Sequence, residues 1–214
     1  MRISFLCSDQ QHPVNDYLNK WIEQQRGIHQ IELVRKKSEL SGGDILFLIS
    51  CSEIIGNEDR AAYHSCLVLH ASDLPLGRGW SPHIWQILEG EKELTLSLLE
   101  AEDKVDSGRI WKKIKFQVPK HALWNEINKQ LFEKEIELID LVVNQFEKIL
   151  PESQDLSVTA TYYPRRTPLD SKIDPLQSIA SQFDKIRVCD PQRFPAFFEI
   201  QGKKYKVILE KIND

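Results

Sequence analysis

Cysteine is scarce in this sequence, and its placement excludes two common kinds of site. The four cysteines stand at positions 7, 51, 66 and 189, with no second cysteine or histidine at the spacing of metal ligands. Structural zinc sites and disulfide frameworks both depend on close, repeated spacings of these residues. We therefore expect no metal site, and we expect reduced thiols in a cytoplasmic protein.

An excess of basic residues is also missing. The chain has 28 Lys and Arg against 32 Asp and Glu, for a formal net charge of −4, whereas a nucleic-acid partner usually requires a basic face. Apolar runs are short, and none approaches the roughly 18 residues of a membrane span. The first residues form a run too short for a signal peptide. The sequence predicts a soluble protein with neither a nucleic-acid nor a membrane partner.

What the first half has instead is an alternation of short apolar runs and helical patterns. Nearly continuous apolar runs are typical of strands buried on both faces, and their alternation with helices indicates an α/β fold with a doubly wound, mostly parallel sheet. The expected strands are 1–7, 28–34, 45–49 and 66–69, and the expected helices are one around residues 17–22, one at 58–64 and one at 82–88.

The second half predicts two more strands, a long helix and a small extension. Strands are expected at 94–99 and 110–118 around an acidic loop at 100–108, and an amphipathic helix from Pro119 to about Leu150. A polar loop at 151–173 precedes a helix at 175–183. A Gln201-Gly202 turn between apolar runs then predicts a β-hairpin. We expect a main α/β domain at 1–150 and an extension at 151–214.

One segment combines a strand, a titratable group and a glycine-rich loop. The run 66–69 delivers His70 to the C-terminal end of a strand, which is the edge where open α/β sheets bind ligands. A histidine there can exchange protons near neutral pH. The loop that follows His70 has the sequence Ala-Ser-Asp-Leu-Pro-Leu-Gly-Arg-Gly and ends at Gly79. The segment resembles the His-x-Ser-Leu-Leu-Pro-x-x-Arg-Gly signature of folate-dependent formyltransferases, and the matching positions are His70, Ser72, Leu74, Pro75, Arg78 and Gly79.

The resemblance implies a fold, a cofactor and a set of site residues. Asp106-Ser107-Gly108 stands where the family has its Asp-x-Gly, so His70 and Asp106 are the expected catalytic pair. The aspartate would orient the imidazole and stabilise its charged form. The cofactor would be 10-formyltetrahydrofolate. The implied cofactor-binding residues form two loops, Cys51, Ser52, Glu53, Ile54 and Ile55 in one and Glu100, Ala101, Glu102, Asp103 and Val105 in the other.

The implied substrate-binding residues come from three places in the chain. Ser72, Arg78 and Gly79 belong to the signature loop. Arg166 opens Arg-Thr-Pro-Leu-Asp-Ser, which with Phe194-Pro195-Ala196-Phe197 resembles pieces that follow the catalytic domain in sugar-nucleotide and methionyl-tRNA formyltransferases. His12 precedes a helix whose N-terminus could face a pyrophosphate; an ordinary strand–helix connection is the alternative. For Arg166 the alternative is a solvated surface arginine.

The sequence departs from the family at two points. Family members carry an asparagine two residues before the histidine, on the same strand face, and this chain has Val68, which donates no hydrogen bond. We expect protonated His70 helped by Asp106, a backbone N–H or a water to stabilise the oxyanion instead. The histidine also stands earlier in the chain than in the family, which predicts a shortened sheet.

Three kinds of acceptor amine remain open: a nucleotide-linked amino sugar, methionyl-tRNA and glycinamide ribonucleotide. The acidic composition weighs against tRNA, and the glycinamide enzymes lack the Arg-x-Pro-x-Asp-Ser piece. The sequence therefore favours a small-molecule partner, a nucleotide-linked amino sugar such as a 4-amino-4,6-dideoxy sugar, and is compatible with a homodimer. The alternatives are a folate-binding protein with weak or lost turnover and a hydrolase that releases formate from the cofactor.

Overall fold

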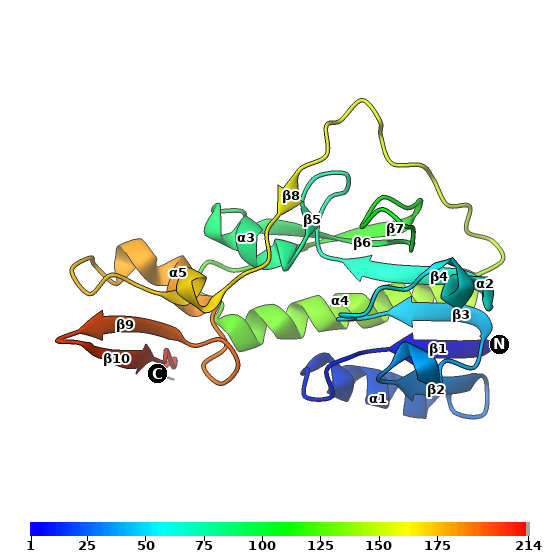
Figure 1. The fold of residues 1–214 in the computed structure, drawn as a ribbon, viewed down its shortest axis with the longest axis horizontal. Helices are drawn as coiled ribbons and strands as arrows, with labels where there is room; N and C mark the ends of the chain where they lie inside the picture. The colour runs from blue at the N-terminus through cyan, green and yellow to red at the C-terminus, as the bar shows by residue number, and fades with distance from the viewer. Residues whose placement is uncertain (213–214) are drawn as a thin grey trace.

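A six-stranded sheet forms the centre of the computed structural model, which describes residues 1–212 (Figure 1). The strands follow the order β2-β1-β3-β4-β6-β7, and β1 to β4 run parallel, while β6 is antiparallel to both β4 and β7. The predicted mostly parallel α/β sheet is confirmed. The strands are β1 Arg2–Leu6, β2 Gln30–Val34, β3 Gly43–Leu48, β4 Tyr63–His70, β6 Glu93–Glu100 and β7 Ile110–Gln117.

Both faces of the inner strands are buried, which explains their nearly continuous apolar sequences. On β4, Leu67 belongs to the larger core, whereas Cys66 and Val68 pack in a smaller cluster on the opposite face. Neighbouring side chains of a strand point to opposite faces. A strand covered on both sides therefore has no solvent-facing position to fill with polar residues.

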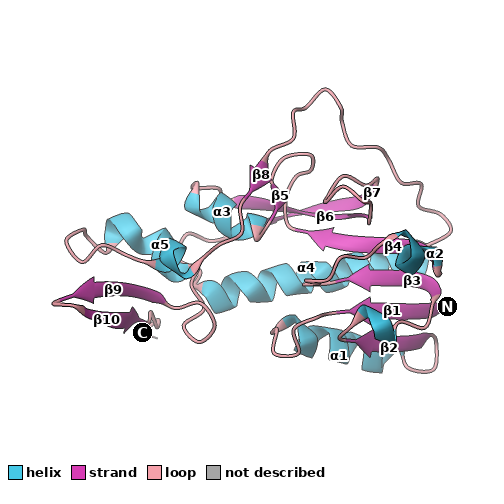
Figure 2. Ribbon diagram, in the orientation of Figure 1, coloured by secondary structure: helices cyan, strands magenta, loops and turns pink. Residues whose placement is uncertain are grey.

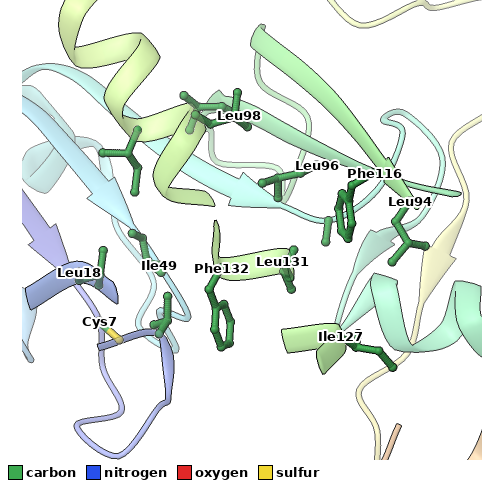
Figure 3. Close-up of a cluster of buried hydrophobic side chains, with 14 of the residues drawn as sticks. Cys7, Leu18, Ile49, Leu94, Leu96, Leu98, Phe116, Ile127, Leu131 and Phe132 are labelled. Carbon is green, nitrogen blue, oxygen red and sulfur yellow. The ribbon is translucent and has the colours of Figure 1, made fainter. Parts of the chain in front are cut away.

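The larger core lies between the sheet and three helices: α1 Val14–Gln25, α3 Pro82–Leu88 and α4 Trp124–Gln145. Helix α4 runs alongside the sheet (Figure 2). Figure 3 shows Leu131 of α4 on the side of Leu96 of β6 and Phe116 of β7, whereas the Phe132 ring points toward Cys7 and packs against Tyr17 of α1. The shorter α2 Asn57–Ala61 packs against β4. None of the helices within residues 1–212 combines the length and apolar character that crossing a membrane would need.

Three predicted helices have different limits in the structure. The helix expected at 58–64 ends at Ala61 because Tyr63 already pairs with Gly43 as the first residue of β4. Helix α4 begins at Trp124 and ends at Gln145, so the prediction of 119–150 was too long at both ends. The helix expected at 175–183 lies later in the chain, as a 3₁₀ turn Ala180–Gln182 followed by α5 Phe183–Arg187, because Gln182 binds the backbone of Asp174 and fixes 174–179 as a loop.

After α4, the C-terminal segment first pairs with the signature loop and then continues away from the sheet. After α4 the chain forms a long arch (Figure 1) that leads to β8 Tyr162–Tyr163, which pairs in parallel with β5 Arg78–Gly79. A 3₁₀ turn Pro168–Ser171 follows, and the chain ends in β9 Ala196–Ile200 and β10 Lys203–Val207. The predicted hairpin is confirmed, with both turn residues, Gln201 and Gly202, at positive φ. The boundary at 150 stays a prediction.

Candidate active site

His70 lies at the C-terminal end of β4, and only 6% of it is exposed. Strand pairing places it opposite Ser97 of β6, so the antiparallel neighbour holds this strand end in place. The following residues fold back at once, because the Ser72 backbone N–H donates to the His70 carbonyl. The β4 strand thus presents one nearly buried imidazole at the edge of the sheet.

The His70 ring has a protein group next to each of its nitrogens. Nε2 lies 2.8 Å from the Gly77 carbonyl oxygen. Since a carbonyl only accepts, Nε2 carries a proton and donates it in this hydrogen bond. Nδ1 lies 3.6 Å from Asp106 Oδ1, which is longer than a good hydrogen bond but close for an ion pair. Nδ1 is therefore the nitrogen left to exchange a proton, and the carboxylate stabilises the charged ring.

Asp106 is held by the turn between β6 and β7. Its other oxygen, Oδ2, accepts a 2.8 Å hydrogen bond from the Gly79 backbone N–H, and its φ is +54°, a conformation that aspartate tolerates better than most residues. Gly108 explains the rest of the Asp-x-Gly motif, because a Cβ there would collide with the Glu100 carbonyl. The motif positions one carboxylate and lets two strands approach closely.

The Arg-Gly end of the signature loop is fixed by the C-terminal segment. Gly79 has φ +99° and lies so close to the Tyr163 backbone that no side chain fits. The buried Arg78 guanidinium donates from Nη2 to Gln154 Oε1 at 2.6 Å, and Gln154 Nε2 donates to the Asp106 carbonyl at 2.8 Å. Arg78 thus acts through Gln154 on the loop that carries Asp106. The sequence carried no signal for Gln154.

Ser72 lies beneath the signature loop and is 1% exposed. Its carbonyl accepts a 2.7 Å hydrogen bond from Ser97 Oγ, while its hydroxyl has no partner within residues 1–212. This burial favours a part in loop packing, and direct contact of Ser72 and Arg78 with substrate stays a prediction.

The two predicted cofactor loops meet on the face of the sheet that carries Val68. Cys51, Ile55 and Ala101 pack in the same apolar cluster as Val68. Arg60 of α2 links the two loops, because its Nη2 forms a 2.6 Å ion pair with Asp103 Oδ1 and its Nη1 donates to the Ile55 carbonyl. Ile54 and Val105 remain 88% and 63% exposed. Sequence-distant loops thus form one surface with exposed apolar side chains.

Several polar groups of these loops are already bonded within the protein. The carbonyls of Ile54 and Ile55 accept from Lys37 Nζ and Arg60 Nη1 at 3.2 and 2.8 Å. The Glu100 carboxylate is paired with Arg109. Within residues 1–212, the backbone N–H groups of Ile54 and Ile55 and the backbone of Val105 make no hydrogen bond. These free groups beside apolar side chains fit a flat heterocycle with a polar edge.

His12 lies on the other side of His70, after β1. Its Nδ1 accepts from the Val14 backbone N–H at 3.2 Å, and its Nε2 lies 3.1 Å from Ser50 Oγ. Burial, reinforced by the Arg193 charge, lowers the pKa of His12 to about 4. A neutral ring with both nitrogens bonded holds the β1–α1 loop against the end of β3. Its predicted contact with substrate remains a prediction, as does that of Arg166.

His83 is a further histidine at this site that the motif analysis missed. It lies in the first turn of α3, where burial, and to a lesser extent the neighbouring basic side chains of His12, Arg166 and His70, lower its pKa to about 4. Three histidines from separate segments therefore gather at one edge of the sheet. The sequence placed His83 in a helix, and no motif distinguished it there.

Residues 5–143 match the model of the family described as formyl transferase. This match covers most of the chain and includes His70, Asp106 and both cofactor loops. The chain belongs to the formyl transferase family. The predicted family and fold class are confirmed.

Similar proteins in the family differ in length and in their described acceptors. A methionyl-tRNA formyltransferase from Rickettsia bellii is 28% identical over 173 residues, covering 80% of this chain and 56% of that protein. The chain therefore spans about half the length of this curated relative. A solved structure from Mycobacterium tuberculosis, described as a likely sugar N-formyltransferase, has a TM-score of 0.74 at 15% identity, covering 100% of this chain and 99% of the other.

A third similar structure is HypX from Aquifex aeolicus, solved in complex with tetrahydrofolic acid. It has a TM-score of 0.79 and 21% identity, covering 95% of this chain and 36% of HypX. At this identity the two structural similarities establish the shared fold. The family membership is shown, and the assignment of the formyltransferase site to the C-terminal edge of β4 stays a prediction.

Proposed function

We propose that this protein is an N-formyltransferase that moves a formyl group from 10-formyltetrahydrofolate to the amine of a nucleotide-linked amino sugar, such as a 4-amino-4,6-dideoxy sugar. The observation that carries the proposal is the setting of His70, whose Nε2 donates to Gly77 while its Nδ1 faces Asp106. In a chain of the formyl transferase family, this leaves one ring nitrogen able to exchange a proton beside a carboxylate.

The chain's own residues handle the proton of the reaction, and the cofactor supplies the formyl group. Nδ1 of His70 accepts the proton that the attacking amine loses. Asp106 stabilises the resulting imidazolium, and the Gly77 carbonyl keeps the ring oriented throughout. The same Nδ1 then returns the proton to the leaving nitrogen. General acid–base catalysis of this kind contributes about 10²–10⁴-fold to the rate.

The two loops above Val68 are the proposed binding surface for the cofactor. Ile54 and Val105 offer exposed apolar side chains, and the free backbone N–H groups of Ile54 and Ile55 offer hydrogen-bond donors. The predicted contacts of residues 51–55 and 100–105 with the pterin ring rest on this fit. A crystal structure with tetrahydrofolate tests them directly, and pterin density elsewhere contradicts the assignment.

For the acceptor, the overall charge favours a small molecule, because the chain has a net charge of −4. The extent of the structural similarity does not separate the candidates. The fold matches the likely sugar N-formyltransferase over 100% of this chain and 99% of the other, and a methionyl-tRNA formyltransferase from Clostridium thermocellum over 97% of both chains. Methionyl-tRNA is the second candidate, because the curated relatives also carry that name, although this chain spans about half of the one from Rickettsia bellii.

An assay of the purified protein with 10-formyltetrahydrofolate separates these candidates. We expect formylation of thymidine- or uridine-diphosphate-linked 4-amino-4,6-dideoxyhexoses and no formylation of methionyl-tRNA. Formylated methionyl-tRNA would replace the proposed acceptor by the second candidate. Formate release at the same rate with and without an amine would indicate a hydrolase, and tetrahydrofolate binding without any turnover would indicate a binding protein.

A further inference from the structure

Helix α3 carries a histidine toward the end of β4. His83 lies three residues before Gln86, and residues at this spacing share one face of a helix. Gln86 Nε2 donates a 2.8 Å hydrogen bond to the carbonyl of Ala71, the residue directly after His70. The face of α3 that carries His83 and Gln86 is therefore turned toward the catalytic strand end.

The His83 ring differs from the two other histidines at this edge. His70 and His12 each have protein groups next to both ring nitrogens. The His83 ring makes no hydrogen bond with any group in residues 1–212, and the residue is half-buried, so a ligand can reach it. Its two nitrogens are free to bind a substrate.

The surroundings of His83 keep its ring uncharged. Burial is the largest cause of its lowered pKa, about 4, and three neighbouring basic side chains add to it: His12 from the β1–α1 loop, Arg166 from the segment after β8 and His70 from β4. A neutral imidazole has one N–H donor and one nitrogen with a lone pair. At neutral pH this ring can therefore accept a hydrogen bond from an amine.

His83 and the cofactor loops lie on opposite faces of the sheet. The loops pack with Val68 in the smaller apolar cluster, whereas Ile84 and Ile87 of α3 pack in the larger core. His70 stands between them at the strand end. A formyl donor held by the loops leaves the side of His83 for the molecule that attacks the formyl carbon.

We propose that His83 binds the acceptor amine: its free ring nitrogen accepts a hydrogen bond from one amine N–H and directs the amine lone pair toward the formyl carbon. The inference rests on the proposed function. The new C–N bond forms as the carbonyl electron pair moves to the formyl oxygen, and the amine proton passes to Nδ1 of His70. The electron pair on the oxygen then re-forms the carbonyl bond, the bond between the formyl carbon and the cofactor nitrogen breaks, and that nitrogen receives the proton from Nδ1 of His70.

Two variants of His83 and one matched control test the role. His83→Phe removes the hydrogen-bond acceptor but keeps an aromatic ring, and His83→Gln restores an acceptor. His64→Phe is the control, because the His64 side chain is 76% exposed at the other end of β4. We expect His83→Phe to raise KM for the amino-sugar nucleotide about tenfold or more, His83→Gln to recover most of this loss, and His64→Phe to change nothing.

Binding measurements separate an amine contact from a general structural effect. Affinity is measured for tetrahydrofolate, for the amino-sugar nucleotide and for its 4-deoxy counterpart, which has hydrogen in place of the amine and so cannot donate a hydrogen bond there. His83→Phe should keep the tetrahydrofolate affinity and lose the preference for the amine over the 4-deoxy counterpart. An unchanged preference overturns the proposal, and so does an equal loss of tetrahydrofolate affinity.

A separate assay distinguishes failure of this inference from failure of the proposed acceptor. If the wild-type protein formylates no amino-sugar nucleotide, the proposed acceptor class is wrong, and the variants are compared with hydroxylamine as a minimal amine. A rate lower in His83→Phe than in wild type and His64→Phe then supports the amine contact. Equal rates in all three proteins overturn it.

Discussion

The two sides of His70 are built in opposite ways. On the proposed cofactor side, two surface loops leave Ile54 and Val105 exposed, and Arg60 of α2 links them by pairing with Asp103 and donating to the Ile55 carbonyl. On the other side, His12 and His83 are histidines whose pKa values burial lowers to about 4. One side is an open apolar surface that a ligand would complete. The other presents two neutral imidazoles, of which His12 is hydrogen-bonded within the protein and, within residues 1–212, His83 is not.

The two sides therefore differ in the interaction that each can form with a ligand. Exposed apolar side chains lose their contact with water when a flat ligand covers them, so binding itself stabilises that side. On the other side, the half-buried His83 ring lacks a hydrogen-bond partner within residues 1–212, so a ligand that covers it without a hydrogen bond would leave a polar group buried and unpaired, which costs free energy. This side therefore favours a ligand that can hydrogen-bond.

The largest effect on the rate of formyl transfer should come from a substitution of His70, which lies between the two sides. His70→Asn removes the proton-accepting Nδ1, and we expect formyl transfer to fall about 10²–10⁴-fold with the fold intact. Steady-state rates and circular dichroism check this, with His64→Asn as the exposed control. A folded His70→Asn protein that keeps more than about a tenth of the wild-type rate contradicts the assignment.

The second-largest effect is expected on the stability of the protein, from a substitution of Gln154 in the C-terminal segment that holds the signature loop. Gln154→Ala leaves the buried Arg78 guanidinium without its 2.6 Å partner and frees the Asp106 carbonyl. We expect a loss of about 1–3 kcal/mol in the free energy of unfolding, measured by urea denaturation. The exposed Gln192→Ala serves as the control. Equal stability of the two variants would mean that Gln154 does not support the site.

A smaller effect on the reaction rate is expected from a substitution of Val68, on the proposed cofactor side. An indispensable oxyanion donor is worth roughly 10²–10³ in rate, so a working enzyme with valine here must use another donor. Val68→Asn should therefore change the rate less than about tenfold, with Val68→Ala as the control for lost volume. A gain of a hundredfold or more would instead favour a folate-binding protein with weakened turnover.

The smallest effect, on tetrahydrofolate binding, should come from removing the ion pair between Arg60 and Asp103. Asp103 is 81% exposed, and surface ion pairs contribute little. Asp103→Asn should weaken tetrahydrofolate binding less than about fivefold, and added salt should reduce the difference. Glu102→Gln in the same loop is the control. A much larger loss would mean that the Asp103 carboxylate, and not only the backbone of this loop, contacts the cofactor.

Sequence periodicity predicted most of the sheet and failed at helix ends. Apolar runs identified β1, β3 and β4, because strands buried on both faces have no polar positions. The helix at 175–183 was wrong because Gln182 binds the Asp174 backbone, a contact between side chain and loop that leaves no periodic trace. The α4 limits were wrong because local propensity hardly distinguishes a helix end from the polar turns beside it.

The sequence by itself determined the family, the strand that ends at His70 and the Asp-x-Gly turn that carries Asp106, because these depend on residues at short, fixed spacings. Only the tertiary structure decided which nitrogen of His70 is free, how Gln154 supports Arg78 and that His83 joins the site. Each of these depends on hydrogen bonds or burial between segments far apart in the chain. No local pattern encodes such contacts, because the folded chain creates them.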